Sequence, residues 1–252
     1  MLRQYQSLEN RLLNLCDAAD LKQIQPHLIT MPMGYKDALY EPYQPIDWVY
    51  FPIEGVVSLV NTMSNGEGAE VGTIGNEGVV GLPVILGDQT TPSSAYVQVP
   101  GSCLRLPAAT FHNQLLNSVP FRSVMLRYAH AFFNQVAITA ACNALHTIEQ
   151  RCCRWFLMTH DRVQSNKFIL TQEFLGMMLG VQRTSVTKAA RALQARQIVS
   201  YQRGHVTVLN RQALEKQSCE CYAVGKREFD RLLGPPLGPS GRMAEAQRTS
   251  RP

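Results

Sequence analysis

A run of polar side chains, Gln182-Arg183-Thr184-Ser185, resumes as Thr187-Lys188 inside a stretch that is otherwise apolar at helical spacing. Arginine can donate two hydrogen bonds to guanine, lysine can reach guanine or phosphate, and threonine offers a hydroxyl or a contact to the thymine methyl. We therefore predict that Arg183, Thr184 and Lys188 read base edges. Contacts to phosphate position a protein without reading sequence, and Gln182, Ser185 and Thr187 suit that role.

These side chains need two short helices and a tight turn to present them. Thr171 is a plausible N-cap for a helix through Leu179, Gly180 supplies the turn, and a second helix runs from Arg183 to Gln194. Thr171 is also counted among the candidate phosphate contacts.

The spacing of the buried positions supports this arrangement. Counted from Gln172, the inward sites hold apolar residues and the sites where helices cross closely hold small ones: Leu175, Leu179, Val181 and Val186, with Gly176 and Ala189. This spacing predicts a DNA-binding helix-turn-helix, whose second helix enters the major groove by its N-terminal end. The alternative is an ordinary α-hairpin with a solvated polar face.

The segment "IVSYQRGHVTVLN" follows the second helix and is typical of two strands around a turn at Arg203-Gly204. Such a β-wing would hold Arg203 and His205 near the DNA backbone. The sequence thus predicts a winged helix.

Charge is distributed unevenly along the chain. Residues 1–119 contain five basic and eleven acidic side chains, whereas residues 165–233 contain eleven basic and five acidic ones. Concentrated positive charge is the electrostatic footprint of nucleic-acid binding. On charge alone, a solvated basic surface fits equally well.

Before the helix-turn-helix, the sequence pattern changes from one typical of strands to one typical of a helix. Residues 28–106 contain short Val-, Tyr- and Leu-rich runs punctuated by Gly, Pro and Asn, which indicates a small antiparallel sandwich or barrel. From Phe121 to Leu145 there is no Gly or Pro, and apolar residues recur every three or four positions, as in a long helix.

The apolar stripe of that helix is too wide for one packing surface. One face can cover the β-domain and the other, rich in alanine, can meet its twin in a homodimer, although burial of both faces within one chain is the alternative. The predicted dimer residues are Met125, Ala129, Phe132, Phe133, Val136, Ala137, Ala140, Ala141 and Ala144.

The segment Thr147-Ile148-Glu149-Gln150 matches a capping box and predicts a hinge followed by a second helix to about His160. The expected organisation has five parts. These are an N-terminal helical segment (1–27), a β-roll sensor domain (28–119), a dimerisation helix with hinge and following helix (120–163), a winged helix-turn-helix (164–234) and a disordered tail (235–252).

With 252 residues the chain is long enough for two modest domains. Its apolar stretches are too short and broken for a membrane span, and its first residues lack the apolar region of a signal peptide, so we expect a cytoplasmic protein with no membrane partner. Seven cysteines without a secretory signal favour free buried thiols over a disulfide framework.

The motifs together resemble one family. "YFPIEGVVSL", "GNEGVVGLPVILG", "LTQEFLGMMLGVQRTSVTKAARALQ" and "CECYAVGKREFDRLLG" are similar to segments of Crp/Fnr transcription regulators. The resemblance implies an α+β fold with a cyclic-nucleotide-binding-like jelly roll, a long dimer helix and a winged helix. It also implies a homodimer on palindromic double-stranded DNA, with RNA polymerase as a partner if the protein is an activator. Arg183, Thr184 and Lys188 fall on the family's base-reading sites.

The resemblance also marks an effector pocket, at Gly81, Leu82, Ser93, Ser94 and Val136. In members that bind cyclic nucleotides, an acidic residue after the family glycine holds the ribose and an Arg-Ser or Arg-Thr pair holds the phosphate. Here those places hold Leu82 and Ser93-Ser94, and the helix positions that offer hydroxyls to the base hold Val136 and Ala137. We therefore expect no response to cyclic AMP.

Iron–sulfur sensing, another input of this family, uses closely spaced N-terminal cysteines, and here only Cys16 lies in that region. Five further cysteines lack persuasive metal spacing, so we expect structural thiols, no metal, no cofactor and no enzyme activity, with any redox role left open: Cys142, Cys152, Cys153, Cys219 and Cys221. A regulator of transcription is the leading hypothesis, and a redox or ligand sensor that acts through protein association is the alternative.

Overall fold

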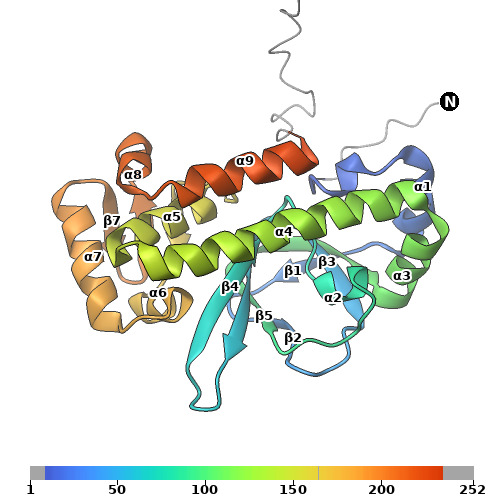
Figure 1. The fold of residues 1–252 in the computed structure, drawn as a ribbon, viewed down its shortest axis with the longest axis horizontal. Coiled ribbons are helices and arrows are strands. Elements are labelled where there is room, and N and C mark those ends of the chain that lie inside the picture. Colours follow the sequence, from blue (N-terminus) through green and yellow to red (C-terminus); the bar gives the residue numbers. More distant parts are fainter. Residues whose placement is uncertain (1–8, 164, 235–252) are drawn as a thin grey trace, which may run out of the picture.

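The computed structural model describes residues 9–163 and 165–234. Its N-terminal domain is a roll built from one antiparallel sheet, with strand order β1-β5-β3-β4 and β2 paired with β5 (Figure 1). The strands are β1 (Ile29–Met33), β2 (Ala38–Tyr40), β3 (Trp48–Thr62), β4 (Gly68–Ile74) and β5 (Ser94–Pro107). The predicted β-texture is confirmed for most of residues 28–106.

The two long strands β3 and β5 each join runs that are separate in the sequence. Register shifts between Pro52 and Val57 bend β3 where it pairs with β5, so that one strand contributes to both sides of the roll. The expectation of strand texture is wrong for residues 78–86, which form no strand: Val80 makes an isolated bridge to Tyr50, and Leu82–Ile85 forms the short helix α2.

Helices close the roll. The 3-10 turns η1 (Leu13–Leu15) and η2 (Gln25–His27) flank α1 (Ala18–Ile24), and α3 (Ala108–Asn117) precedes the long helix α4 (Val119–Leu145). Phe111 makes edge contacts with Phe51 of β3 and Phe121 of α4, with ring centroids 6.1 and 5.5 Å apart. These rings join sheet and helices in one apolar core.

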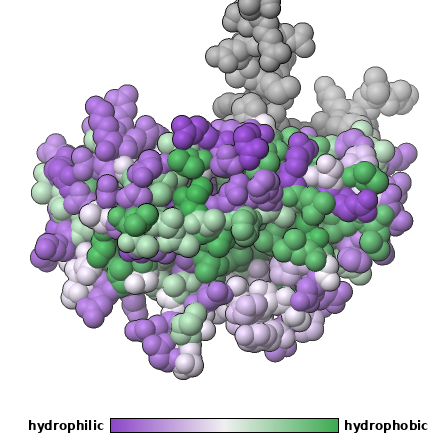
Figure 2. Space-filling view, viewed as in Figure 1, coloured by the Kyte–Doolittle hydropathy of each residue, from purple (hydrophilic) through white to green (hydrophobic). Residues whose placement is uncertain are grey.

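Helix α4 has two different faces. Met125, Ala129 and Phe132 are buried in the core of the roll. On the opposite face Leu126 is 48% exposed and Phe133 is 68% exposed. A band of apolar residues crosses the middle of the molecule on this side in Figure 2.

The chain turns between α4 and α5 (Ile148–His160). The predicted capping box is confirmed, because the Thr147 side chain accepts from the Gln150 backbone and the Gln150 side chain accepts from the Thr147 backbone. The two helices are therefore separate elements that meet at His146.

The C-terminal domain is a winged helix. Helices α6 (Gln172–Leu179) and α7 (Arg183–Ala195) precede a sheet of order β6-β8-β7, formed by β6 (Lys167–Ile169), β7 (Val199–Gln202) and β8 (His205–Val208). The two wing strands were predicted, whereas β6 was not. The predicted fold class, with roll, long helix and winged helix, is confirmed.

Two further helices, α8 (Arg211–Gln217) and α9 (Cys221–Leu233), complete the described chain. Helix α9 runs back alongside α4 toward the start of the roll (Figure 1), where Arg11 contacts Asp230 at 3.1 Å and Asn134 donates to Glu228 at 2.9 Å. The predicted disordered tail (235–252) and the first eight residues of the predicted N-terminal segment lie outside the described residues. Among the described helices, none combines the length and apolarity needed to cross a bilayer.

Candidate nucleic-acid interface, sensor pocket and domain junction

The helix-turn-helix has the predicted local geometry. The Thr171 hydroxyl accepts from the backbone N–H of Phe174 at 3.1 Å and caps α6. Gly180 ends this helix with φ of 60°, a left-handed conformation that favours glycine. A Cβ on Gly176 would lie 2.9 Å from the Val181 carbonyl oxygen, so only glycine lets the turn approach α6 this closely.

The predicted base-reading residues share the outer surface of α7. Arg183, Thr184 and Lys188 are exposed, and neither cation forms an ion pair with any described residue. Arg191 is also exposed and follows Thr184 and Lys188 at helical spacing, so it extends the same stripe by one turn. The sequence analysis did not select Arg191, although the i, i+3 spacing from Lys188 identifies it.

The predicted phosphate contacts divide into two groups. Gln182, the N-cap residue of α7, is exposed, and Ser185 is half-buried beside it. Thr187 instead faces inward, because its hydroxyl lies 2.7 Å from Gln172 Oε1 and 3.0 Å from the Arg183 carbonyl oxygen. Its single proton is used inside the motif, so Thr187 joins α6 to α7.

The wing brings the other phosphate candidates to the same end of the domain. Arg203 and Gly204 form the turn between β7 and β8, with φ values of 48° and 76°. The Leu170 backbone N–H donates to the Gly204 carbonyl at 2.7 Å, which places the turn beside the Thr171 cap. Arg203 is exposed, and His205 lies half-buried with Nδ1 3.2 Å from the Arg203 carbonyl oxygen.

Four of the predicted effector residues lie within the roll, Val136 lies on α4, and none is charged. Gly81 and Leu82 start α2, and Val136 packs partly buried against the roll core from α4. Ser94 is buried at the start of β5, and the neighbouring Ser93 hydroxyl donates to Asn61 Oδ1 at 2.5 Å. The serine predicted at the phosphate position thus already has a partner within the roll.

A polar junction joins the roll to α5. Arg162 contacts Glu77 with Nε at 3.0 Å and Nη2 at 2.8 Å, and both side chains are nearly inaccessible. Burial raises the pKa of Glu77, but the charge and hydrogen bonds of Arg162 outweigh this and hold the pKa below its usual value. This buried ion pair connects the end of α5 to the loop after β4.

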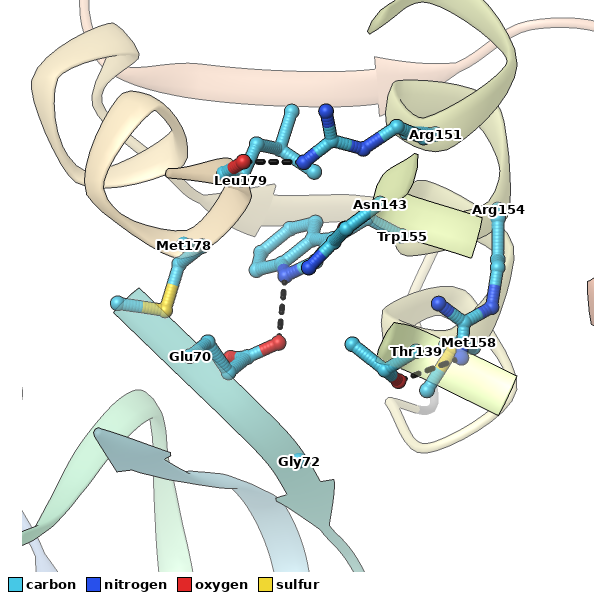
Figure 3. Close-up of a pocket in the computed structure, with 10 residues that line it drawn as sticks. All are labelled: Glu70, Gly72, Thr139, Asn143, Arg151, Arg154, Trp155, Met158, Met178 and Leu179. Atoms are coloured by element: carbon cyan, nitrogen blue, oxygen red, sulfur yellow. Dashed lines mark hydrogen bonds between the residues drawn. The ribbon is translucent and has the colours of Figure 1, made fainter. Parts of the chain in front are cut away.

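Next to this pair, Glu70 of β4 accepts from Trp155 Nε1 of α5 at 3.1 Å. Figure 3 shows the small pocket that it lines with Arg151, Arg154 and the end of α6. Arg151 donates to the carbonyl of Leu179, which links α5 to the turn of the helix-turn-helix. Helix α5 therefore contacts both β4 of the roll and α6 of the helix-turn-helix.

The hydrogen bonds around Ser58 fit a protonated Glu70. Ser58 Oγ lies 2.6 Å from Glu70 Oε2 and 2.5 Å from Gln98 Oε1, but a hydroxyl has one proton. A protonated Glu70 that donates to Ser58 lets Ser58 donate to Gln98, and both contacts are then satisfied. Burial raises the pKa of Glu70 to about 7 and outweighs the hydrogen bonds that Ser58 and Trp155 donate to the ionised carboxylate, which lower the pKa.

One group of side chains brought together by the fold was not anticipated. Cys142, His146, Cys219 and Cys221 converge between the end of α4 and the start of α9. The spacings Cys-x3-His and Cys-x-Cys are the available sequence signals, and they are separated by more than seventy residues of chain. Neither signal alone predicts that the other lies beside it.

The roll, the long helix with one exposed apolar face and the winged helix define a class of protein, the two-domain transcription regulators. The comparisons agree: residues 35–118 match the cyclic nucleotide-binding domain and residues 150–217 match the Crp-like helix-turn-helix domain. The chain belongs to the Crp/Fnr family of regulators. No curated protein matches the sequence of the chain.

Solved structures share the fold at low sequence identity. A Crp/Fnr family regulator from Eubacterium rectale has a TM-score of 0.66 and 17% identity, covering 83% of this chain and 98% of its own. FixK2 from Bradyrhizobium japonicum has a TM-score of 0.64 and 16% identity, covering 76% of this chain and 98% of its own. The c-di-GMP responsive regulator CLP from Xanthomonas campestris has a TM-score of 0.57 and 14% identity, covering 76% and 99%.

Proposed function

We propose that the protein is a sequence-specific DNA-binding regulator of transcription that acts as a homodimer and has no enzyme activity. The observation that carries the proposal is the outer face of α7, where Arg183 and Lys188 are exposed and form no ion pair with a described residue. Exposed, unpaired cations on the second helix of a helix-turn-helix can bind phosphate and the guanine edge. RNA polymerase is the expected partner if the regulator is an activator.

The test is a fluorescence titration of the purified chain against DNA from its own upstream region and against random DNA of equal length. A specific regulator binds the upstream DNA more tightly by a factor of about 10³ or more at physiological salt. Equal affinity for both DNAs would contradict the proposal and favour a sensor that acts through protein association.

The homodimer is proposed to form along the exposed face of α4. Exposed residues on that face recur at alternating steps of four and three, which is the spacing of a coiled-coil seam: Leu126, His130, Phe133, Ala137, Ala140 and Ala144. Ala141 and half-buried Val136 flank this seam. Met125, Ala129 and Phe132 were also predicted at the interface, but they lie inside the core of their own chain and are left out of the proposed seam.

An arginine in the seam tests this assembly. Ala137→Arg places a charge where two helices would pack, so sedimentation should show monomers, whereas Ala109→Arg on the exposed start of α3 should leave the dimer intact. A dimer that survives the first substitution would place the interface elsewhere.

The sensor roll is proposed not to respond to cyclic AMP or cyclic GMP. The predicted pocket has Leu82 and Ser93 where a carboxylate and a guanidinium would be needed, and Ser93 donates to Asn61 instead. Each hydrogen bond to a charged group contributes about 1.5 to 3 kcal/mol, so two missing anchors weaken binding by about two powers of ten or more. Calorimetry that gives a micromolar dissociation constant for either nucleotide would overturn this part of the proposal.

A further inference from the structure

The seven cysteines fall into two kinds of environment. Cys16 and Cys103 lie in the core of the roll, and Cys152 and Cys153 lie in the core of the C-terminal domain, where each is surrounded by apolar side chains. Cys142, Cys219 and Cys221 instead form a small buried cluster of their own, with Ile138 as the neighbouring apolar residue. Packing alone therefore explains the first four thiols better than the last three.

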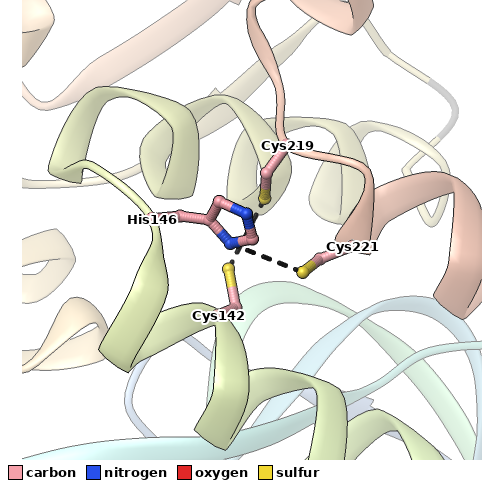
Figure 4. Close-up of side chains that lie close together, drawn as sticks. All are labelled: Cys142, His146, Cys219 and Cys221. Atoms are coloured by element: carbon pink, nitrogen blue, oxygen red, sulfur yellow. Dashed lines mark hydrogen bonds between the residues drawn. The ribbon is translucent and has the colours of Figure 1, made fainter.

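His146 completes the cluster (Figure 4). The three Sγ atoms and a ring nitrogen of His146 all lie within 4.8 Å of one another. The closest approaches are 3.5 Å between the sulfurs of Cys142 and Cys219, and 3.6 Å between the sulfur of Cys221 and Nδ1 of His146. In a tetrahedral zinc site with Zn–S bonds of about 2.3 Å, neighbouring ligand sulfurs are about 3.8 Å apart. The observed spacing is close to this value.

Secondary structure presents the four ligands from two sides. Cys142 lies in the last turn of α4, and His146 is the C-cap residue whose backbone N–H donates to the Cys142 carbonyl, so both side chains lie at this helix end. Cys219 follows the end of α8, and Cys221 is the first residue of α9. Two rigid helix ends and one short turn therefore hold the donors in place.

The remaining nitrogen of His146 has the partner that a metal-bound histidine needs. Nε2 lies 3.2 Å from Glu220 Oε2, while Nδ1 faces the sulfurs. A proton on Nε2 donated to this carboxylate leaves the Nδ1 lone pair directed at the cluster, as in carboxylate–histidine–zinc arrangements. An open groove lined by Ser218, Cys219, Glu220 and Tyr222 gives an ion access from solvent.

We propose that Cys142, His146, Cys219 and Cys221 bind one zinc ion. Three thiolates and a neutral imidazole form a closed four-coordinate set, the arrangement of a structural zinc site. Binding releases the three thiol protons to solvent and involves no oxidation or reduction. Arg154, which acts electrostatically on Cys142 and Cys221, offsets the net negative charge of the filled site.

The ion would join the end of α4 to the turn between α8 and α9. Cys142 and Cys219 are 77 residues apart in the sequence, and the winged helix lies between them in the chain. A site in this place fixes the C-terminal side of the DNA-binding domain to the long helix. It is independent of the effector pocket in the roll and of the DNA-binding face of α7.

The test measures metal content and cobalt spectra of the full chain. Protein purified under reducing conditions should contain one zinc per chain, and exchange with Co²⁺ should give the visible bands of tetrahedral cobalt and a thiolate-to-cobalt charge-transfer band in the near ultraviolet. Cys219→Ser should reduce zinc to background and remove the charge-transfer intensity of its thiolate. Cys153→Ser, which changes a buried thiol outside the cluster, is the matched control and should keep one zinc.

Glu220→Gln supplies a variant that should keep the fold, because the Glu220 side chain is 73% exposed. The change keeps all four ligands and weakens only the contact to Nε2, so chelator competition should show zinc affinity reduced by about 10- to 100-fold. Wild-type protein without zinc, a disulfide between Cys142 and Cys219, or iron with acid-labile sulfide in the cluster would each overturn the proposal.

Discussion

Arginines that link packed elements of the chain and arginines of α7 and the wing are in opposite situations. Arg162 is buried against Glu77, and Arg211 contacts Asp161 at 2.6 Å and Glu215 at 3.0 Å. Arg183, Arg191 and Arg203 are exposed and have no ion-pair partner among the described residues. Arg162 and Arg211 stabilise the chain itself, whereas the arginines of α7 and the wing are free to contact a partner outside it.

The junction should show its role in stability most strongly at Arg162. Arg162→Met leaves the Glu77 carboxylate buried without its partner, so the free energy of unfolding should fall by about 3 to 5 kcal/mol. Urea denaturation measures this loss. The exposed pair of Arg231 with Glu228 is the control, because Arg231→Ala should cost less than about 1 kcal/mol. Equal losses of unfolding free energy in Arg162→Met and Arg231→Ala would show that the buried ion pair contributes no more than the exposed one.

Glu70 should make stability depend on pH. Its pKa rises from 4.5 in the unfolded chain to about 7 in the fold, so the native state binds more protons between these values and stability falls as pH rises through this window. The full effect is about 3 kcal/mol at most. Denaturation curves from pH 4 to 8 should show that Glu70→Gln removes this slope, whereas exposed Glu173→Gln keeps it. An unchanged slope in Glu70→Gln would mean that the carboxyl is ionised throughout.

On α7, Arg183→Ala should leave the free energy of unfolding unchanged and weaken binding to the cognate site by about 1 to 3 kcal/mol. The preference at one base pair should relax, which a titration with single-base variants of the site detects. Losses of the same size on cognate and random DNA would assign Arg183 to phosphate and not to a base.

A smaller effect is expected at Arg191 and Arg203, which we place at phosphates. Changing either to Ala should weaken binding to all sequences alike and reduce the slope of log affinity against log salt by about 1. The variant Arg231→Ala, remote from this face, should keep the slope. A change of base preference in Arg191→Ala would extend base reading one turn further along α7.

Local features were the ones that the sequence predicted well. Thr147 and Gln150 are three residues apart, and Gly176 and Val181 are five apart, so short-range geometry determines both the capping box and the turn. Periodicity also predicts that one face of α4 covers the roll. It did not predict which face does so: the face of Met125 packs on the roll, whereas the face of Leu126 is exposed.

Long-range contacts were not accessible to the same reasoning. Arg162 and Glu77 are 85 residues apart and give no pattern in the sequence until β4 and α5 pack together. The same holds for Cys142 and Cys219, which were interpreted as separate structural thiols. Strand β6 has three residues and owes its pairing to β8, so its own sequence carries little signal. The effector pocket residues remain a prediction that rests on the resemblance.

The return of α9 along α4 has a mechanical consequence. Helix α9 is held to the rest of the chain by Asn134 of α4 with Glu228 and by Arg11 of the N-terminal segment with Asp230. The C-terminal domain also contacts the roll through Arg162 with Glu77 and through Trp155 with Glu70. A rigid body attached at several separate points cannot turn freely, so any reorientation of the recognition helix relative to the roll has to break at least one of these contacts or bend α9.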